Sequence, residues 1–175
     1  MVGHMKILLS IFCLVLLVSC SNEVPSDKLV ERNGITYEVN SQTPFTGSKV
    51  SYHDNSQLRQ KGNYINGKED GLHESYHENG QLRSKWNYID GKVEDGLRES
   101  YHDNGQLWSK ENLKDGKLEG FYEEYYYQNS QLKSRNNLKD GKLDGLWERY
   151  HEDSSVFWKL CYENGEEVDM SYCEK

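Results

Sequence analysis

Short runs of alternating apolar and polar residues fill most of the chain, and each run ends at a turn signal. The runs hold Tyr, Leu and Trp, and pairs such as Asn-Gly, Asp-Gly or Asn-Ser separate them. A period of two with turn residues at both ends is typical of half-buried β-strands that are joined as hairpins. The pattern therefore predicts an all-β fold.

The runs also repeat along the chain. Residues 71–82 read Gly-Leu-His-Glu-Ser-Tyr-His-Glu-Asn-Gly-Gln-Leu, and residues 96–107 repeat this stretch almost unchanged. Tandem units of this kind bury their apolar surface against their neighbours. We therefore predict about five tandem β-hairpins in one elongated, single-layer, twisted antiparallel sheet. Equivalent glycines mark the units at steps of 24 or 25 residues, at Gly47, Gly71, Gly96, Gly120 and Gly145.

The positions of the apolar residues set the register at the first turn of each unit. A three-residue loop at Asp54–Ser56, a type I turn followed by a left-handed residue, pairs Tyr52 with Leu58 on one face. Gly80 and Gly105 occupy the left-handed position in later units, where a side chain is costly.

A three-residue loop at the second turn, Ile65–Gly67, would keep Tyr64, Leu72 and Tyr76 on that same face. This register predicts one continuous apolar stripe along the chain. Its recurring tyrosines are Tyr52, Tyr76, Tyr101, Tyr125 and Tyr150, and its other members are Leu58, Tyr64, Leu72, Leu82, Trp86, Tyr88, Leu97, Leu107, Leu113, Phe121, Leu132, Leu138, Leu146, Val156 and Tyr162.

Two extra residues break the alternation, one near Val93 and one within Tyr125–Tyr127, and we predict a β-bulge at each. Trp108 and Trp147 lie off the stripe in this register. Together with Tyr126 and Tyr127 they are the candidate binding surface, because Trp and Tyr are enriched at binding hot spots. Packing against the long stems of Lys and Arg explains the two tryptophans equally well.

Composition and charge narrow the classes of function. The chain has 175 residues, of which 35% are hydrophobic, and a mean hydropathy of −0.94, which argues against a large globular core. Its formal net charge is −8, and Lys and Arg are interspersed with acids in every unit. Binding to nucleic acid usually needs a basic patch that releases counterions. The sequence therefore predicts no nucleic-acid partner.

The repeats contain no pattern that indicates catalysis. Equivalent residues of successive hairpins lie two strands apart, about 9–10 Å, whereas each ligand of a zinc ion lies about 2 Å from it. The glutamates recur with the unit, so no pair stands out as a general acid and base. We predict no enzyme, no catalytic residue, no metal site and no cofactor. Solvent-facing roles are expected for the histidines that follow the repeated aromatic position, His53, His77, His102 and His151.

One motif resembles a known family. Residues 66–71, Asn-Gly-Lys-Glu-Asp-Gly, are echoed at 115–120 and 140–145, with an aromatic residue five positions after the last glycine. The motif resembles the MORN repeat in its bacterial variant, over roughly residues 45–167. This resemblance implies a sheet of MORN-type hairpins that binds a partner. Bacterial proteins of this type look like antitoxins of toxin–antitoxin modules, which implies a toxin as the partner.

The N-terminus resembles a lipoprotein signal. Lys6 precedes an apolar run, residues 7–18, that is too short to span a bilayer as a mature helix. The run ends in Leu-Val-Ser and then Cys20, which resembles a lipobox and makes Cys20 the expected site of lipidation. Ser21 after this cysteine is typical of sorting to the outer membrane of a Gram-negative cell. Met5 is an alternative start.

These features predict the order of segments and the location of the protein. Cys161 and Cys173 would meet an oxidising compartment, where they either pair or stay free, and we expect a disulfide. We expect a lipid anchor in the cell envelope and an unidentified protein partner, either an envelope component or a toxin. The segments are a signal peptide (1–19), a polar tether (20–28), an N-terminal capping strand (29–44), the repeat array (45–167) and a C-terminal tail (168–175).

Lipidation at Cys20 has a direct test. The substitution Cys20→Ala removes the thiol that would carry diacylglycerol, so the protein should lose its label when cells are grown with alkyne-tagged palmitate. Blotting of the clicked label against total protein measures the change. Ser21→Ala keeps the thiol and should keep the label. A wild-type protein that takes up no label would refute the lipid anchor.

Overall fold

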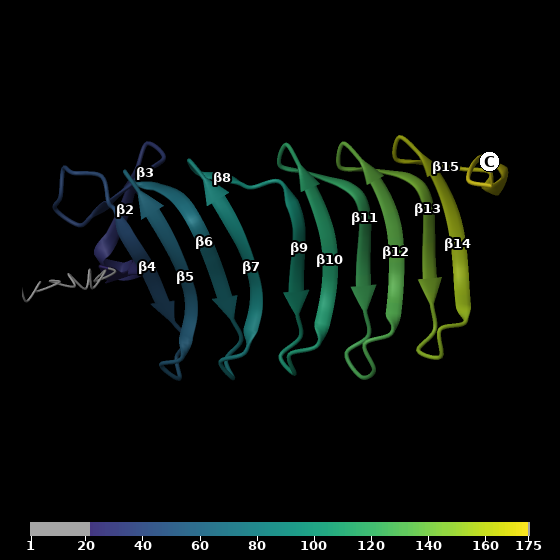
Figure 1. The fold of residues 1–175 in the computed structure, drawn as a ribbon, viewed down its shortest axis with the longest axis horizontal. Coiled ribbons are helices and arrows are strands. Elements are labelled where there is room, and N and C mark those ends of the chain that lie inside the picture. The colour runs from purple at the N-terminus through teal and green to yellow at the C-terminus, as the bar shows by residue number, and fades with distance from the viewer. Residues whose placement is uncertain (1–21, 175) are drawn as a thin grey trace, which may run out of the picture.

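The computed structural model describes residues 22–174 and is a row of antiparallel hairpins in one open, twisted sheet (Figure 1). The sheet's strands are β1 (Glu23–Pro25), β4 (Gly47–Tyr52), β5 (Leu58–Ile65), β6 (Lys68–Tyr76), β7 (Leu82–Ile89), β8 (Lys92–Val93), β9 (Gly96–Tyr101), β10 (Leu107–Lys114), β11 (Lys117–Tyr125), β12 (Leu132–Lys139), β13 (Lys142–Tyr150), β14 (Val156–Glu163) and β15 (Glu166–Val168).

Neighbouring strands of this sheet follow chain order, except that β1 pairs in parallel with β4 and the short β8 pairs only with β7. We number the hairpins one to five as β4–β5, β6–β7, β9–β10, β11–β12 and β13–β14. The predicted all-β array of about five hairpins is confirmed.

Four of the five turns at one end of the hairpins have the predicted three-residue loop, closed in the first by the His53 N–H, which donates to the Gln57 carbonyl. Tyr52 pairs with Leu58 across the first of them, and Ser56, the last residue of that loop, has a φ of 67°. Gly80 and Gly105 take the same left-handed position, with φ values of 83° and 82°. The register predicted for these turns is confirmed.

The turns at the other end are shorter than predicted. Ile65 pairs directly with Lys68, so the loop consists of Asn66 and Gly67 alone. Both loop residues have a positive φ, 51° and 79°, as in a type I′ turn, whose twist matches that of the flanking strands. The predicted three-residue loop is wrong here, because Asn-Gly and Asp-Gly favour the two-residue turn.

The shorter loop divides the predicted stripe between the two faces of the sheet. Gly62 pairs with His73 after a bulge, so His73 shares the face of Tyr64, whereas Leu72 and Tyr76 lie on the opposite face. The prediction of one continuous apolar stripe is therefore wrong. The tyrosines at the three-residue turns still form a row of their own, which passes along the other face.

We name the two faces by the residues that recur on them, since cross-strand partners share a face. The serine face carries Ser75, Ser84, Ser100, Ser109 and Ser134, with the stripe members Tyr64, Trp86, Tyr88, Leu113, Leu138 and Tyr162. The glutamate face carries Glu74, Glu99, Glu123 and Glu148, with Leu72, Tyr76, Leu97, Tyr101, Phe121, Tyr125, Leu146 and Tyr150.

The two extra residues that break the alternation in the sequence are accommodated in different ways. Near Val93 the sheet does not have the single-residue bulge that the sequence predicts, because β8 ends at Val93, β9 begins at Gly96, and only two residue pairs join β7 to β9. The extra residue within Tyr125–Tyr127 enters the turn instead. There the Tyr126 N–H donates to the Gln131 carbonyl at 2.9 Å across a longer loop. The bulge predicted at this site is wrong, since a turn absorbs a residue without breaking the strand pairing.

A bulge also lies beside the first turn of every hairpin, which the sequence did not predict. In the first hairpin Ser51 pairs with Gln60 but Tyr52 pairs with Leu58, which leaves one residue unpaired. Such a bulge re-aims the side chain of the extra residue. The extra residues of the five hairpins are Arg59, Arg83, Trp108, Lys133 and Phe157.

Asparagine side chains join each of these turns to the next one. The amide nitrogen donates to a carbonyl of the following hairpin, while the amide oxygen accepts the backbone N–H two residues on. The fifth turn has Asp153 at this position, and a carboxylate cannot donate. The four bonds run from Asn55 to Glu78 (2.7 Å), Asn79 to Asp103 (2.5 Å), Asn104 to Tyr127 (3.1 Å) and Asn129 to Glu152 (3.0 Å).

A second row of side chains joins the hairpins beside the asparagines. The expected solvent-facing role of the repeated histidines is wrong for three of them, because their Nε2 atoms donate to a backbone carbonyl of the next hairpin. Tyr126 replaces histidine in the fourth hairpin, and His151 is exposed at the end of the row. The bonds run from His53 to Tyr76 (2.9 Å), His77 to Tyr101 (2.8 Å), His102 to Tyr125 (3.2 Å) and Tyr126 to Tyr150 (2.8 Å).

The N-terminal edge of the array is covered by the residues before it. Strand β1 and the short helix η1 (Ser26–Lys28) occupy most of the segment expected to be a tether. Strands β2 (Leu29–Arg32) and β3 (Ile35–Glu38) form a separate hairpin where one capping strand was expected. The Thr36 N–H donates to the Gly67 carbonyl at 2.8 Å, which ties this hairpin to the array. The cap and array enclose a buried cluster of Val24, Phe45 and Tyr64.

The C-terminal segment folds back on the last hairpin. Helix η2 (Met170–Tyr172) follows β15, and a disulfide joins Cys161 of β14 to Cys173, with a Cα–Cα distance of 6.0 Å. Residues 1–19 and Cys20, for which a signal peptide and a lipid anchor are predicted, lie outside the described residues. Within residues 22–174 no helix has the length and apolarity to cross a bilayer.

Two adjacent turns provide a matched test of the asparagine bonds. Asn129→Asp keeps the acceptor of the side chain but removes its donor, so the free energy of unfolding should fall by about 1 kcal/mol, or about 2–4 °C in melting temperature. Asp153→Asn restores a donor where no further hairpin follows, and should leave the melting temperature unchanged. Circular dichroism during heating measures both. Equal effects of the two substitutions would contradict a bond between hairpins.

Candidate functional site

The charges of the glutamate face are matched to one another. Each member of a row of alternating basic and acidic residues is the cross-strand neighbour of the next. Ion pairs close between Arg135 and Glu123 and between Lys159 and Glu148, the second at 2.6 Å. Lys61 at the end of the row pairs with Glu23 at 2.6 Å, and opposite charges alternate along the rest, so the row offers little net charge to a ligand. In order it is Lys61, Glu74, Lys85, Glu99, Lys110, Glu123, Arg135, Glu148 and Lys159.

Tyrosines of the repeated row orient these glutamates. The hydroxyl of Tyr125 donates to Glu123 at 2.7 Å, and that of Tyr101 donates to Glu99 at 2.9 Å. Burial of Glu123 opposes ionisation, but the bonds from Tyr125 and Arg135 outweigh it and hold the pKa of Glu123 below its usual value. Burial and the same carboxylate raise the pKa of Tyr125 to about 12. The tyrosines therefore support the charge row and are not free for chemistry.

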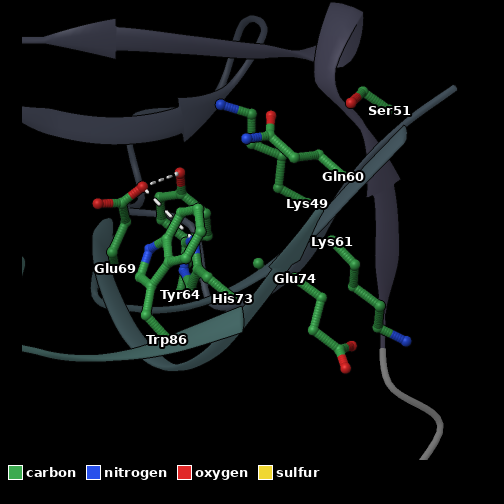
Figure 2. A pocket seen from close by; sticks show the side chains of 10 residues that line it. Lys49, Ser51, Gln60, Lys61, Tyr64, Glu69, His73, Glu74 and Trp86 are labelled. Atoms are coloured by element: carbon green, nitrogen blue, oxygen red, sulfur yellow. Dashed lines mark hydrogen bonds and ion pairs between the residues drawn. The ribbon is translucent and has the colours of Figure 1, made fainter. Parts of the chain in front are cut away.

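A small cavity on the serine face lies under the first two hairpins (Figure 2). Its volume is about 50 Å³. Figure 2 shows Tyr64 and His73 converging on Glu69, whose Oε1 accepts from the Tyr64 hydroxyl at 3.2 Å and lies 3.7 Å from His73 Nδ1. The His73 ring fits because Gly62 faces it, since a Cβ at Gly62 would lie 2.3 Å from the ring.

The polar atoms of Tyr64 and His73 have partners within the protein, whereas Trp86 Nε1 is buried in the same cavity without one. His73 Nε2 donates to the Asn63 carbonyl at 3.1 Å, and burial, followed by the Glu69 carboxylate, raises the pKa of Tyr64. A nucleophile or general base needs a free lone pair near neutral pH, whereas the Tyr64 hydroxyl stays protonated. The cluster packs the N-terminal end of the sheet. Its hydrogen bonds are those of a structural network and not of a catalytic site.

A larger groove crosses the first three hairpins on the serine face. It encloses about 330 Å³, and its floor is the row of small cross-strand neighbours Ser75, Ser84 and Ser100. Larger side chains border this floor. We call the whole groove the arginine groove. It is defined by Arg59, Arg83, Arg98, Trp86 and Trp108 around the three serines.

The bulges build this groove. Strict alternation from Gln60 would turn Arg59 toward the glutamate face, but it is the extra residue of its bulge and lines the groove beside Gln60. Arg83 and Trp108 are the extra residues of the next two hairpins and line it in the same way. The bulges thus bring one side chain from each of three successive hairpins to a common surface.

The lining of the groove is basic in an acidic protein. The chain has 29 Asp and Glu residues against 21 Lys and Arg, yet no carboxylate lines the groove. Arg98 is matched by Glu111 at 2.5 Å and lies 5.6 Å from the centre of the Trp86 ring. Arg59 and Arg83 are exposed, and within residues 22–174 their guanidinium groups have no ion pair or hydrogen bond. Two unmatched positive charges therefore face the solvent in this groove.

The four aromatic residues proposed from sequence do not form one surface. Trp108 lines the arginine groove and is 39% exposed. Tyr127 joins it in an adjoining hollow, where the His102 ring lies between them at 6.4 and 5.1 Å. Tyr126 is engaged with the next hairpin through its hydroxyl. Trp147 packs against Trp158 in the fifth hairpin, 5.0 Å between ring centres.

The two unmatched arginines were not proposed from sequence. Arg59 and Arg83 resemble the basic residues that are interspersed with acids in every unit, and alternation alone assigns them to the other face. The signal that would have found them is their step of 24 residues, which continues with Trp108 at a step of 25.

The comparison with protein families covers this part of the chain. Three of the repeats match the MORN repeat variant. The matched segments are residues 45–66, 69–90 and 94–115, which span the first three hairpins and the whole arginine groove. MORN repeats are in general noncatalytic scaffolds that often bind membranes or proteins. No curated protein matches the chain.

The charge row predicts a defined dependence of stability on pH. The folded-state pKa of Glu123 is lowered from 4.5, so ionised Glu123 stabilises the fold above about pH 4.5 and this contribution is lost as the pH falls through the lowered pKa. Glu123→Gln should cost about 1–2 kcal/mol at pH 7 and almost nothing below the lowered pKa. Urea unfolding between pH 7 and pH 2 measures the difference.

Glu78→Gln is the control for this series. Glu78 is exposed in a turn, and its carboxylate makes no ion pair or hydrogen bond within the described residues. Its substitution should leave the free energy of unfolding unchanged at both ends of the pH range. A cost of Glu123→Gln that is equal at pH 7 and at pH 2 would show that the carboxylate's charge does not contribute.

Proposed function

We propose that the protein is a membrane-anchored, noncatalytic repeat scaffold that binds a protein partner in the cell envelope. The observation that carries the proposal is the arginine groove, which combines unmatched Arg59 and Arg83 with exposed Trp108 on one face of the sheet. Arginine and tryptophan are the residues most enriched where binding energy concentrates in protein interfaces. The match of this region to the MORN repeat variant supports a binding role.

The architecture favours recognition over chemistry. Ion pairs hold several charges of the glutamate face, and the Tyr64 hydroxyl and His73 are bonded within the protein. The arginine groove has charges that are not matched. A partner with complementary charge would match Arg59 and Arg83 without disturbing the array. Such a role needs no catalytic residue.

The proposed anchor fits the position of the groove. Strand β1 begins at Glu23, close in sequence to Cys20, and its pairing with β4 places it at the N-terminal edge of the array. A lipid on Cys20 would therefore hold this edge near the bilayer. The groove lies in the first three hairpins, so a bound partner would sit near the membrane. The remaining hairpins extend away from it along the sheet.

Affinity capture of the tagged full-length lipoprotein from its own cells tests the proposal. We expect a partner that binds wild type and is lost from the variant Arg59→Ala, Arg83→Ala, Trp108→Ala, because the variant removes the unmatched charges and the exposed ring. Quantitative mass spectrometry of the eluates measures the loss. Arg149→Ala, an exposed arginine of the same face in the fifth hairpin, should retain the partner.

The identity of the partner separates two roles. A single stoichiometric toxin-like protein would assign an antitoxin or immunity role in the envelope. An envelope component would assign the scaffold role. An identical set of captured proteins with wild type and with the groove variant would contradict a role for the groove in binding.

A further inference from the structure

We infer that the arginine groove receives a segment of the partner in polyproline II conformation, with acidic residues at every third position. This inference deepens the proposed function and rests on it. It follows from the spacing of Arg59, Arg83 and Trp108, from the charge of the groove lining, and from the hydroxyl groups on its floor.

The spacing comes from the repeat. Arg59, Arg83 and Trp108 are the bulged residues of successive hairpins, so neighbours in this series lie two strands apart, about 9.4–9.8 Å. A polyproline II helix has three residues per turn and a rise of about 3.1 Å per residue, which repeats its side chains about every 9.3 Å. A β-strand places residues i and i+3 on opposite sides. The array therefore matches polyproline II and not an extended strand.

The charges determine which side chains fit this spacing. Arg59 and Arg83 present guanidinium groups that pair with carboxylates through two parallel N–H bonds. At the third step Trp108 offers an apolar ring, and Asp103 lines the hollow beyond it, which disfavours another acid there. The segment that fits is acidic-x-x-acidic-x-x-apolar, running along the array and across the strands.

The floor of the groove suits the backbone of such a segment. A polyproline II helix makes no internal hydrogen bonds, so its carbonyls are free to accept from a binding surface. Ser75, Ser84 and Ser100 form a row across three strands under the groove. The hydroxyls of Ser75 and Ser84 share a hydrogen bond of 2.6 Å, which leaves the proton of one of them and that of Ser100 to donate. A strand-like partner would instead need a free sheet edge, and the serine face offers none.

Other anionic ligands fit the groove less well. A nucleic acid or an anionic bilayer would bring many negative charges close to a protein of net charge −8, and two unmatched arginines do not offset this repulsion. A peptide with two acidic residues brings only the charges that the groove can pair. An anionic glycan remains as the competing occupant and is included in the test.

The test uses the full-length lipoprotein in detergent micelles and a fluorescein-labelled peptide, Glu-Pro-Pro-Glu-Pro-Pro-Trp. The matched control peptide, Glu-Glu-Pro-Pro-Pro-Pro-Trp, has the same composition and the wrong spacing. Fluorescence anisotropy at low salt should show tighter binding of the first peptide. Arg59→Ala, Arg83→Ala should weaken it about tenfold, while Arg149→Ala should not.

Each other outcome overturns the inference. Equal binding of the two peptides would refute the spacing, and unchanged binding by the double variant would refute the site. Binding of a heparin oligosaccharide that depends on Arg59 and Arg83, without binding of the peptide, would identify an anionic glycan. Unchanged melting of the variants shows that they are folded. If the peptide fails while captured partners still depend on the groove, the proposed function stands and only the ligand class is wrong.

Discussion

The contact between neighbouring hairpins is the interaction on which this structure depends. A single-layer sheet has no second layer to cover it, and the buried hydrophobic residues are few. Asn129 and its equivalents add a side-chain bond at each junction, and His53 and its equivalents add another. The repeated unit is thus specified by what it offers to its neighbour. The buried hydrophobic residues within 22–174 are Val24, Phe45, Val50, Tyr64, Leu113 and Cys161.

The two faces of the single-layer sheet differ in how their charges are matched. Nearly every strand contributes one charge to the glutamate face, where basic and acidic residues alternate as cross-strand neighbours and several of them form ion pairs. The serine face carries serines in the equivalent row of the second and third hairpins, and the arginine groove lies over them. Bulges then add Arg59 and Arg83 to this face without a partner for either. The unmatched charges therefore lie where the repeat supplies no partner of its own.

The sequence predicted the fold well and the site in part. Periodicity and glycines at positive φ, such as Gly80, determined the hairpins and their first turns. The second turns were predicted wrongly, because the length of a loop decides on which face the next strand's side chains lie. The loop at Asn66-Gly67 is one residue shorter than predicted, so Tyr64 and Tyr76 lie on opposite faces. Arg59 was missed for a related reason: a bulge overrides alternation, and a bulge beside a turn leaves no compositional signal. Trp108 was found because its residue type alone suggested binding.

Asp153 gives the array an end. An amide at this place in the unit reaches forward to another hairpin, whereas the carboxylate of Asp153 holds only its own turn through Ser155. A unit copied within the array by gene duplication would bring its own asparagine and find a neighbour on both sides. A unit added after the fifth hairpin would find no donor at that turn. Repeats can therefore be inserted between existing hairpins during evolution. The carboxylate of Asp153, in place of an amide, ends the row of asparagine bonds.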